Sequence, residues 1–267
     1  MKKKILLVSG CSNTDPNYVS LQHPDMDCSW PKWPELLAKK LDMECINLAR
    51  SGAGNEYIYS TLIDKLQTID PSDIGLCIAA WSSANRRDYQ SDGRWKQHIY
   101  SQTETPPLWH KESMLDFIDR SIRYFYSFQN VCEHLKIPYK QFSAMCLYES
   151  YGWQETMRRM TKDFPDDPNE QVPIINKKQN LTADEKTLLN DYEIKCTEQI
   201  RKSPYYNMIN ANFLGWPPTQ RLGGFNMSHK MKLPRSVNSN ECIISELDSH
   251  PNATGQIQIA KFLHELL

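Results

Sequence analysis

The segment Ile5-Leu6-Leu7-Val8-Ser9-Gly10-Cys11-Ser12-Asn13-Thr14 decides the fold, because an apolar run leads directly into a small polar turn. Residues 4–9 predict a buried first strand of a parallel sheet. Ser12 stands just past the end of that strand. Ligands of open α/β sheets bind at the carboxyl ends of the strands, so this serine is expected at the functional edge.

The order of the predicted elements indicates the fold class. They are strands at 4–9, 44–47, 74–80 and 139–147 and helices at 35–41, 55–67, 112–135 and 253–267. The run at 74–80 is apolar throughout, as expected of a central parallel strand. The alternation of strands and helices predicts a mostly parallel, doubly wound sheet with helices on both faces, which is a three-layer α/β/α fold.

The middle of the chain is more polar than the rest. Residues 151–162 and 182–201 predict helices joined by a Pro- and Asp-rich connection, and Thr182-Ala183-Asp184-Glu185 is a capping box. We therefore expect a single domain over residues 1–267, with a helical insertion or lid at about 150–235. This insertion should pack over the carboxyl edge of the sheet and shape a pocket there.

Composition excludes several classes of protein. The net charge of −1 lacks the basic excess of a nucleic-acid-binding protein, and no apolar run approaches the roughly 20 residues of a membrane span. The eight cysteines include no C-x-x-C pair, which favours reduced core residues in a cytoplasmic protein over disulfides or a zinc site. No metal and no cofactor are expected, and neither nucleic acid nor membrane is expected as a partner.

The first residues allow a second interpretation. Met1-Lys2-Lys3-Lys4, followed by the apolar run up to Cys11, imitates a bacterial lipoprotein signal. The apolar part is shorter than the roughly 7–15 residues of a signal peptide's hydrophobic region. A buried strand preceded by charged residues explains the same letters and is the favoured interpretation.

A second polar cluster, Asp248-Ser249-His250-Pro251-Asn252, stands directly before the last predicted helix. Histidine is the most frequent general base in enzymes, and a nearby carboxylate can orient its imidazole. A serine after the first strand and an Asp/His pair near the end of the chain together suggest nucleophilic acyl transfer. This chemistry requires the sheet to bring the two ends of the chain together.

Four segments in this chain resemble the blocks of a known family. They are Gly10-Cys11-Ser12, Asn47-Leu48-Ala49-Arg50-Ser51-Gly52-Ala53-Gly54-Asn55-Glu56, Trp81-Ser82-Ser83-Ala84-Asn85-Arg86 and Asp248-Ser249-His250-Pro251-Asn252. In this order they resemble the Gly-Asp-Ser block, the oxyanion-glycine block, the Gly-x-Asn-Asp block and the Asp-x-x-His-Pro block of the SGNH (GDSL-type) hydrolases. The resemblance covers both ends and the first third of the chain, residues 90–240 only loosely, and it implies a flavodoxin-like sheet.

A finer resemblance concerns one branch of that family. The Cys-Ser variant of the first block, the Gly-Ala-Gly-Asn-Glu run and the segment Phe213-Leu214-Gly215-Trp216-Pro217 are most similar to a divergent branch found in bacteriophages. If the protein is phage-encoded, this branch implies a location in the cytoplasm of the host.

The resemblance implies a role for each member of a catalytic group. Ser12 would be the nucleophile, His250 the base and Asp248 the supporting acid, with the backbone N–H groups of Ser12 and Gly52 in the oxyanion hole. The family places its acid three residues before the histidine, and Leu247 stands there. Asp248 would need an altered turn to reach Nδ1 of His250. Otherwise the ring N–H of His250 would donate its hydrogen bond to a backbone carbonyl instead.

The third block departs most from the family, since no Gly-x-Asn-Asp is present. Either Ser83 or Asn85 is expected to supply the missing side-chain donor of the oxyanion hole. Asn55, Trp81 and Arg86 are the candidates for contact with substrate. Each also has a structural interpretation: Asn55 as a helix cap, Trp81 as a packing residue and Arg86 as surface cover.

These motifs predict a serine esterase that hydrolyses small acyl esters, with O-acetyl groups on carbohydrate as the expected substrate class. The expected partner is thus a small-molecule or carbohydrate ester. The alternative is a catalytically degenerate relative that acts as a phage-associated binding or structural component. The two departures from the motifs favour this alternative, whereas the presence of Ser12, Gly52 and His250 together favours the enzyme.

Overall fold

A computed structural model describes residues 2–99, 113–148, 183–230 and 241–267 of this protein. The strands are β1 (Ile5–Ser9), β2 (Glu44–Asn47), β3 (Ile74–Trp81), β4 (Arg86–Ser91), β5 (Arg94–Ile99), β6 (Tyr139–Ser143) and β7 (Phe213–Leu214). The helices are α1 (Trp33–Lys40), α2 (Asn55–Leu66), α3 (Met114–His134), α5 (Ala183–Lys202), α6 (Met227–Lys230) and α7 (Ala253–Glu265).

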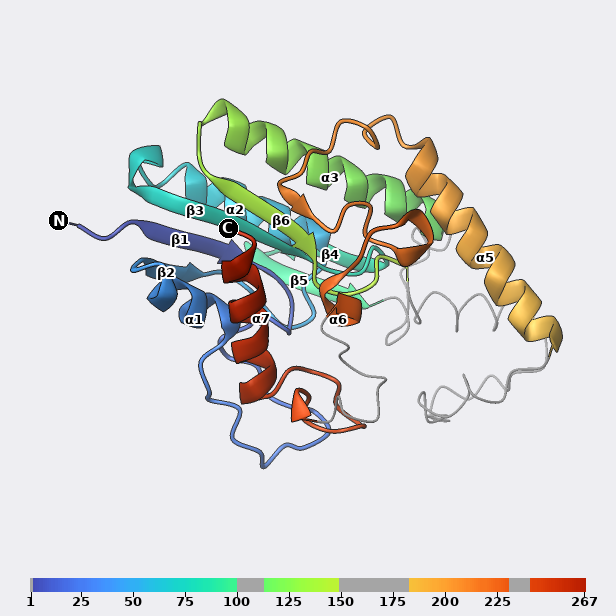
Figure 1. Cartoon of the computed structure of the whole chain (residues 1–267), viewed down its shortest axis with the longest axis horizontal. Coiled ribbons are helices and arrows are strands. Elements are labelled where there is room, and N and C mark those ends of the chain that lie inside the picture. Colours follow the sequence, from blue (N-terminus) through green and yellow to red (C-terminus); the bar gives the residue numbers. More distant parts are fainter. Residues whose placement is uncertain (1, 100–112, 149–182, 231–240) are drawn as a thin grey trace.

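Five strands form a parallel sheet in the order β2-β1-β3-β6-β7, shown in Figure 1. Counted in chain order within this sheet, the order is the flavodoxin-like 2-1-3-4-5. The direction of winding reverses at β1, so a topological switch point lies between β1 and β3. Ligand sites of such folds lie at the carboxyl ends of the strands beside the switch point. The predicted doubly wound sheet is confirmed.

Helices cover both faces of this sheet, because successive residues of a buried strand point to opposite sides. Leu7 of β1 and Cys77 of β3 pack in a hydrophobic cluster with α2, α3 and α5, whereas Leu6 and Ile78 pack in a second cluster with α1 and α7. Figure 1 shows α1 and α7 together on one side of the sheet and α2 and α3 on the other. The fold is therefore the predicted three-layer α/β/α arrangement.

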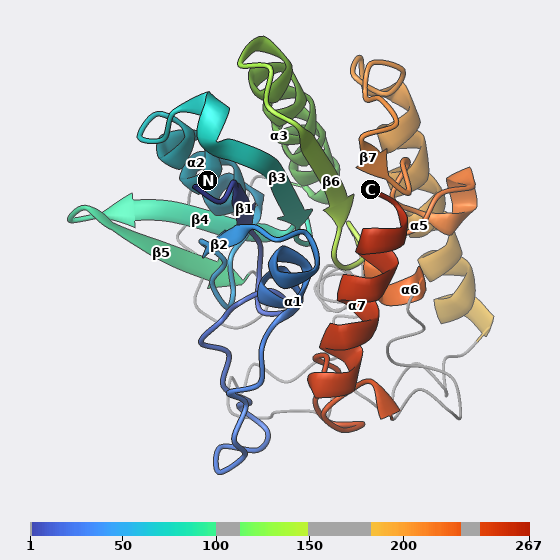
Figure 2. The same cartoon turned by 60° about the vertical axis from the view of Figure 1, so that its left-hand side comes forward.

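A two-stranded hairpin formed by β4 and β5 was not predicted. The two strands pair antiparallel from Arg86–Ile99 to Ser91–Arg94, and the hairpin projects away from the central sheet in Figure 2. Asp92 and Gly93 form its turn, with φ of 52° and 69°. An Asp-Gly pair with positive φ at both residues is typical of a type I′ hairpin turn. The flanking residues are mostly polar, so no apolar alternation marked them as strands.

The segment at about 150–235 is described only in part. The helix predicted at 151–162 and the capping box at Thr182 lie outside the described residues. Helix α5 packs against α3, and β7 joins the sheet as an edge strand beside β6. At least Phe213 and Leu214, the two residues of β7, therefore belong to the sheet itself although they lie within the predicted insertion. The covering of the carboxyl edge by this insertion stays a prediction.

The cysteines are all free thiols, and six of the eight are buried. These six lie in the packed interior as small apolar residues, as the sequence predicted. Among the helices of the described segments, none has the length and apolarity that crossing a membrane requires.

The N-terminus of α2 receives its cap from β4 rather than from its own sequence. Asp88 accepts hydrogen bonds from the backbone N–H groups of Gly54, at 2.9 Å, and of Tyr57, at 2.8 Å. These are donors that a helix leaves unpaired at its start. Asp88 is only 4% exposed, and burial raises the pKa of its carboxyl to about 6, although the two backbone hydrogen bonds oppose the rise.

This raised pKa predicts a pH dependence of stability. Between about pH 4 and pH 6 the folded protein keeps the Asp88 proton and the unfolded chain loses it, so stability falls as pH rises. We expect the free energy of unfolding of wild type, relative to Asp88→Asn, to fall by about 2–3 kcal/mol from pH 4 to pH 7. Urea unfolding of both proteins at several pH values measures this. A constant difference between them would contradict the prediction.

Candidate active site

The two ends of the chain meet beyond the carboxyl end of β1. Ser12 Oγ lies 2.8 Å from His250 Nε2, and His250 Nδ1 lies 2.6 Å from Asp248 Oδ1. With the Nδ1 proton donated to the carboxylate, Nε2 carries the lone pair that faces the serine hydroxyl. The three side chains thus form one continuous hydrogen-bonded relay with the geometry that activates a nucleophilic serine.

The start of α7 holds the loop that contains His250 against the loop that contains Ser12. Asn252 caps α7 by accepting the Gly255 N–H at 3.0 Å. One turn into the helix, the Gln256 side chain accepts the backbone N–H of Trp33 at 2.8 Å and donates to the carbonyl of Asn13 at 3.2 Å. Gln256 therefore ties α7 both to α1 and to the residue that follows Ser12.

The two-residue spacing does not keep Asp248 away from His250. One carboxylate oxygen, Oδ1, accepts both the backbone N–H of His250, at 3.1 Å, and its ring Nδ1–H. The other oxygen, Oδ2, accepts the hydroxyls of Tyr18 and Ser20. Burial opposes ionisation, but hydrogen bonds from His250, Ser20 and Tyr18 outweigh it and hold the pKa of Asp248 well below its usual range. The carboxylate therefore stays charged, as an acid that stabilises an imidazolium must be.

The loop that contains Gly52 lies beside the loop that contains Ser12, since the backbone N–H of Arg50 donates to the carbonyl of Gly10 at 3.1 Å. Gly52 has a φ of 81°, in the left-handed region that favours glycine. Within the part of the chain that the structure describes, the N–H groups of Ser12 and Gly52 have no hydrogen-bond acceptor. Unpaired donors near a nucleophile are the components of an oxyanion hole.

Asp15, which was not among the predicted site residues, joins the loop that contains Ser12 to the loop that contains Gly52. Its Oδ2 accepts both the backbone N–H and the hydroxyl of Ser51, at 2.7 and 2.5 Å. Its Oδ1 accepts the N–H of Asn17 at 2.8 Å. The sequence Asp15-Pro16-Asn17 is typical of a turn, and only that local bond follows from it. The contact with Ser51 required the fold.

We expect Asp15→Ala to destabilise the protein by about 1–3 kcal/mol more than Asp27→Ala, because Ser51 N–H loses its buried acceptor. Asp27 is a matched control, since its carboxylate accepts the N–H of Ser29 in the same local way but is exposed. Urea unfolding of the two variants measures the difference. Equal losses of stability would show that Asp15 acts only within its own turn.

The third-block segment offers one free side-chain donor. The Ser83 hydroxyl donates to Asn85 Oδ1 at 2.7 Å, so this hydroxyl proton is already engaged. The same bond turns the amide so that Asn85 Nδ2 is buried without a partner in the described residues. Of the two predicted candidates, Asn85 therefore retains a donor and Ser83 orients it.

The three candidates for substrate contact are instead structural. Asn55 is 3% exposed and bonds both to the backbone N–H of Ser82, at 2.8 Å, and to its carbonyl, at 3.2 Å. Trp81 is fully buried and donates its indole N–H to Gln141 at 2.9 Å. Arg86 is 9% exposed and donates to the carbonyl of Ala53.

These contacts correct the predicted roles. Asn55 joins the second block to the third and does not cap α2, a role that Asp88 takes. Trp81 packs against Phe125 in the core, where no sugar ring can reach it. Arg86 supports the loop that contains Gly52 and, being nearly buried, does not cover the surface.

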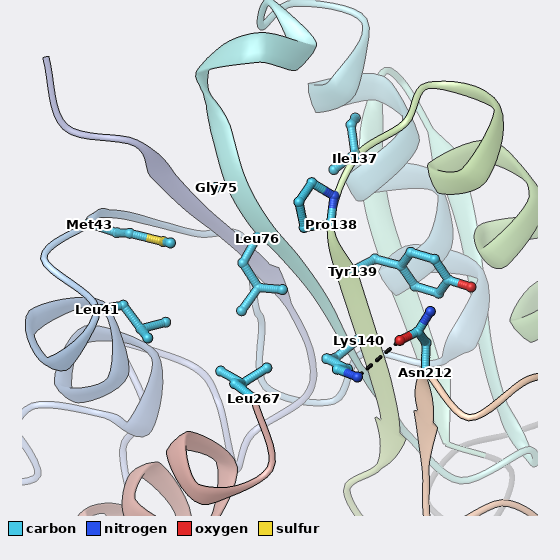
Figure 3. A pocket seen from close by; sticks show the side chains of 10 residues that line it. All are labelled: Leu41, Met43, Gly75, Leu76, Ile137, Pro138, Tyr139, Lys140, Asn212 and Leu267. Atoms are coloured by element: carbon cyan, nitrogen blue, oxygen red, sulfur yellow. Dashed lines mark hydrogen bonds between the residues drawn. The ribbon is translucent and has the colours of Figure 1, made fainter.

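A pocket elsewhere in the fold has no part in this arrangement. Leu76, Tyr139 and Lys140 line it at the amino ends of β3 and β6, together with Leu267, and Lys140 donates to Asn212 at 2.9 Å (Figure 3). Ser12 follows the carboxyl end of β1. The pocket therefore lies at the opposite edge of the sheet and contains none of the relay residues.

The sequence comparisons leave the relay unassigned. A family model described as "Family of unknown function (DUF6071)" matches residues 21–143, which is less than half of the chain. This match begins after Ser12 and ends before Asp248 and His250. No curated protein sequence is significantly similar to this chain.

Several solved structures that are similar to this chain are of esterase-type proteins. One is a candidate lipolytic protein of the G-D-S-L family from Desulfitobacterium hafniense, with 8% identity, a TM-score of 0.45 and 100% of both chains covered. A candidate GDSL-like lipase from Parabacteroides merdae has 11% identity and a TM-score of 0.42, over 99% of this chain and 95% of that one. An acetyl xylan esterase from the rumen bacterium Butyrivibrio proteoclasticus has 12% identity and a TM-score of 0.44, over 100% of this chain and 64% of that one. At these values the likenesses assign no activity to this chain, and roles for its residues rest on their geometry.

Proposed function

We propose that this protein is a serine esterase of the SGNH type that hydrolyses small acyl esters through an acyl-enzyme. The observation that carries the proposal is the continuous relay of Ser12, His250 and Asp248, with separations of 2.8 and 2.6 Å. Each contact is within hydrogen-bonding distance, and the carboxylate at the end of the relay is buried and charged. A serine that served only as a turn residue would need none of these partners.

The proposed reaction uses each member of the relay in turn. Ser12 Oγ attacks the acyl carbon while its proton passes to His250 Nε2, and Asp248 stabilises the imidazolium that forms. The tetrahedral intermediate expels the alcohol, which takes the proton from Nε2. Water then attacks the acyl-serine ester and gives a proton to His250 Nε2. The second tetrahedral intermediate breaks its bond to Ser12 Oγ, which takes the proton back from Nε2, and the carboxylic acid leaves.

The developing oxyanion has three proposed donors. They are the backbone N–H groups of Ser12 and Gly52 and the Nδ2 of Asn85. Losing one such donor costs about 10²–10³ in rate, so a complete set distinguishes an efficient enzyme from a weak one. The free N–H groups and the orientation of Asn85 by Ser83 support this assignment.

The proposed substrates are short acyl esters, and within this class O-acetyl groups on carbohydrate. The membership of a bacteriophage-like branch and the location in a host cytoplasm are parts of the proposal that rest on the sequence motifs alone. The partner proposed is a small-molecule or carbohydrate ester.

The experiment that tests the proposal combines turnover with labelling. The purified protein should hydrolyse p-nitrophenyl acetate and butyrate and release acetate from acetylated sugars. A fluorophosphonate probe should modify Ser12, and peptide mass spectrometry should locate the label there. A folded protein that neither turns over these esters nor takes the label would instead support the degenerate binding or structural relative.

A further inference from the structure

The loop after Ser12 reaches the acid of the relay. The Tyr18 hydroxyl donates to Asp248 Oδ2 at 2.7 Å, and its oxygen lies 2.8 Å from His250 Nδ1. The Ser20 hydroxyl donates to the same Oδ2. The Tyr18 ring also packs on the imidazole, with ring centroids 4.4 Å apart. None of these contacts is needed for a turn, and all of them converge on the His250–Asp248 pair.

The residues of this loop alternate between the relay and solvent. Tyr18 and Ser20 are 9% and 0% exposed, whereas Val19 and Leu21 between and after them are 60% and 89% exposed. Farther along, His23 Nε2 lies 2.7 Å from the hydroxyl of Ser245, in the loop that carries Asp248. The segment from Tyr18 to His23, which we name the strap, is therefore joined to the loop that contains His250 along its length.

We propose that Tyr18 and Ser20 are positioning residues that compensate for the short spacing between Asp248 and His250. A carboxylate only two residues from its histidine bonds to that residue's own backbone N–H, and this local bond alone leaves the second oxygen without a partner. The two strap hydroxyls occupy that oxygen and hold the carboxylate plane so that Oδ1 faces Nδ1. This inference rests on the proposed esterase function.

The strap also acts on the charge of the pair. Asp248 is buried, and an ionised carboxylate in such a place requires hydrogen-bond donors. The hydroxyls of Tyr18 and Ser20 supply two of them, and neither carries a charge of its own. The phenolic oxygen, whose proton points to Asp248, turns its lone pairs toward Nδ1 and can share the Nδ1 proton. The strap therefore stabilises the imidazolium without competing for Nε2, which stays directed at Ser12.

Tyr18→Phe tests the proposal, with Tyr139→Phe as a matched control. Tyr139 is also a buried tyrosine, 6% exposed, and its hydroxyl donates to Glu133 at 2.9 Å, but it lies at the opposite edge of the sheet. We expect Tyr18→Phe to lower kcat by about 10- to 100-fold with little change in KM, by analogy with the range found when partners that orient a metal-ligating histidine are removed. Tyr139→Phe should leave both constants within a few-fold. A rise in KM at unchanged kcat, or equal losses in the two variants, would overturn the positioning role.

A comparison of single and double variants shows whether Tyr18 acts by positioning Asp248 or by stabilising the protein in general. In an Asp248→Asn background there is no carboxylate to hold. Adding Tyr18→Phe to that variant should therefore lower kcat by a further factor of less than about 3. The full 10- to 100-fold loss in both backgrounds would mean that Tyr18 acts independently of Asp248. Ser20→Ala is the second variant, and it should show the same dependence on Asp248 even if Tyr18→Phe fails to fold.

A readout independent of turnover keeps this inference separate from the proposed function. In the proton NMR spectrum, the hydrogen-bonded Nδ1–H of His250 should give a downfield signal that is absent from His250→Ala. Tyr18→Phe or Ser20→Ala should shift or broaden this signal, and Tyr139→Phe should not. If the wild type hydrolyses no ester but the signal responds in this way, the esterase proposal fails, whereas the positioning of the His250–Asp248 pair by Tyr18 and Ser20 is supported. An unchanged signal in both Tyr18→Phe and Ser20→Ala would overturn the proposal that the strap positions Asp248.

Discussion

Ser12→Ala is expected to lower kcat for short acyl esters by on the order of 10⁶-fold, because the acyl-enzyme can no longer form. His250→Ala should be nearly as damaging. The double variant should lose little more than either single one, since the members of a catalytic unit act together and their effects do not add. Steady-state turnover of p-nitrophenyl acetate, with burst-phase measurement of the acyl-enzyme, gives these values.

Ser9→Ala is the control for this experiment. Ser9 ends β1, is fully buried and shares a hydrogen bond of 3.0 Å with Thr61, so its loss perturbs the same strand without touching the relay. It should reduce stability by about 1 kcal/mol and leave kcat nearly unchanged. If Ser12→Ala retained turnover, the description of the fold would still hold, but Ser12 could not be the nucleophile.

Asp248→Asn is expected to lower kcat/KM by about 10⁴-fold. The amide cannot carry the charge that stabilises the imidazolium, and it can present an N–H to Nδ1, which favours the tautomer whose Nε2 is protonated and unable to accept from Ser12. The separation of 2.6 Å between Oδ1 and Nδ1 is the reason to expect the full effect in spite of the short spacing.

Glu246→Gln is the matched control for the acid, because Glu246 lies in the same loop and is exposed. Its loss of charge should change kcat/KM by less than a few-fold. If Asp248→Asn reduced activity no more than Glu246→Gln does, His250 would not depend on this carboxylate. The strap would then have no functional consequence.

The sequence was sufficient for the strands β1, β2, β3 and β6 and for most of the helices, but the edge strand β7 was not predicted. The predicted strand at 44–47 is β2, and the predicted strand at 74–80 and helix at 55–67 match β3 and α2 to within about a residue. These elements are specified by hydrophobic runs and periodicities within a few residues of each other. The hairpin of β4 and β5 was missed because its strands bury little, although Asp92-Gly93 marked the turn.

Local sequence also placed Ser12 and His250 on loops at element ends, but it left the position of Asp248 open, and it left Asn55, Trp81 and Arg86 open between contact with substrate and a structural role. Burial decided the last three, since whether a side chain faces the core depends on which elements pack over it. The sequence by itself thus determined the parallel α/β architecture and the residue types available for acyl transfer. Only the tertiary structure decided that Asp248 reaches His250 and that Asp15, Tyr18 and Ser20 hold the loops together. Tyr18 and Ser20 lie about 230 residues before Asp248 in the chain, and no local pattern encodes a contact that the packing of α7 against α1 creates.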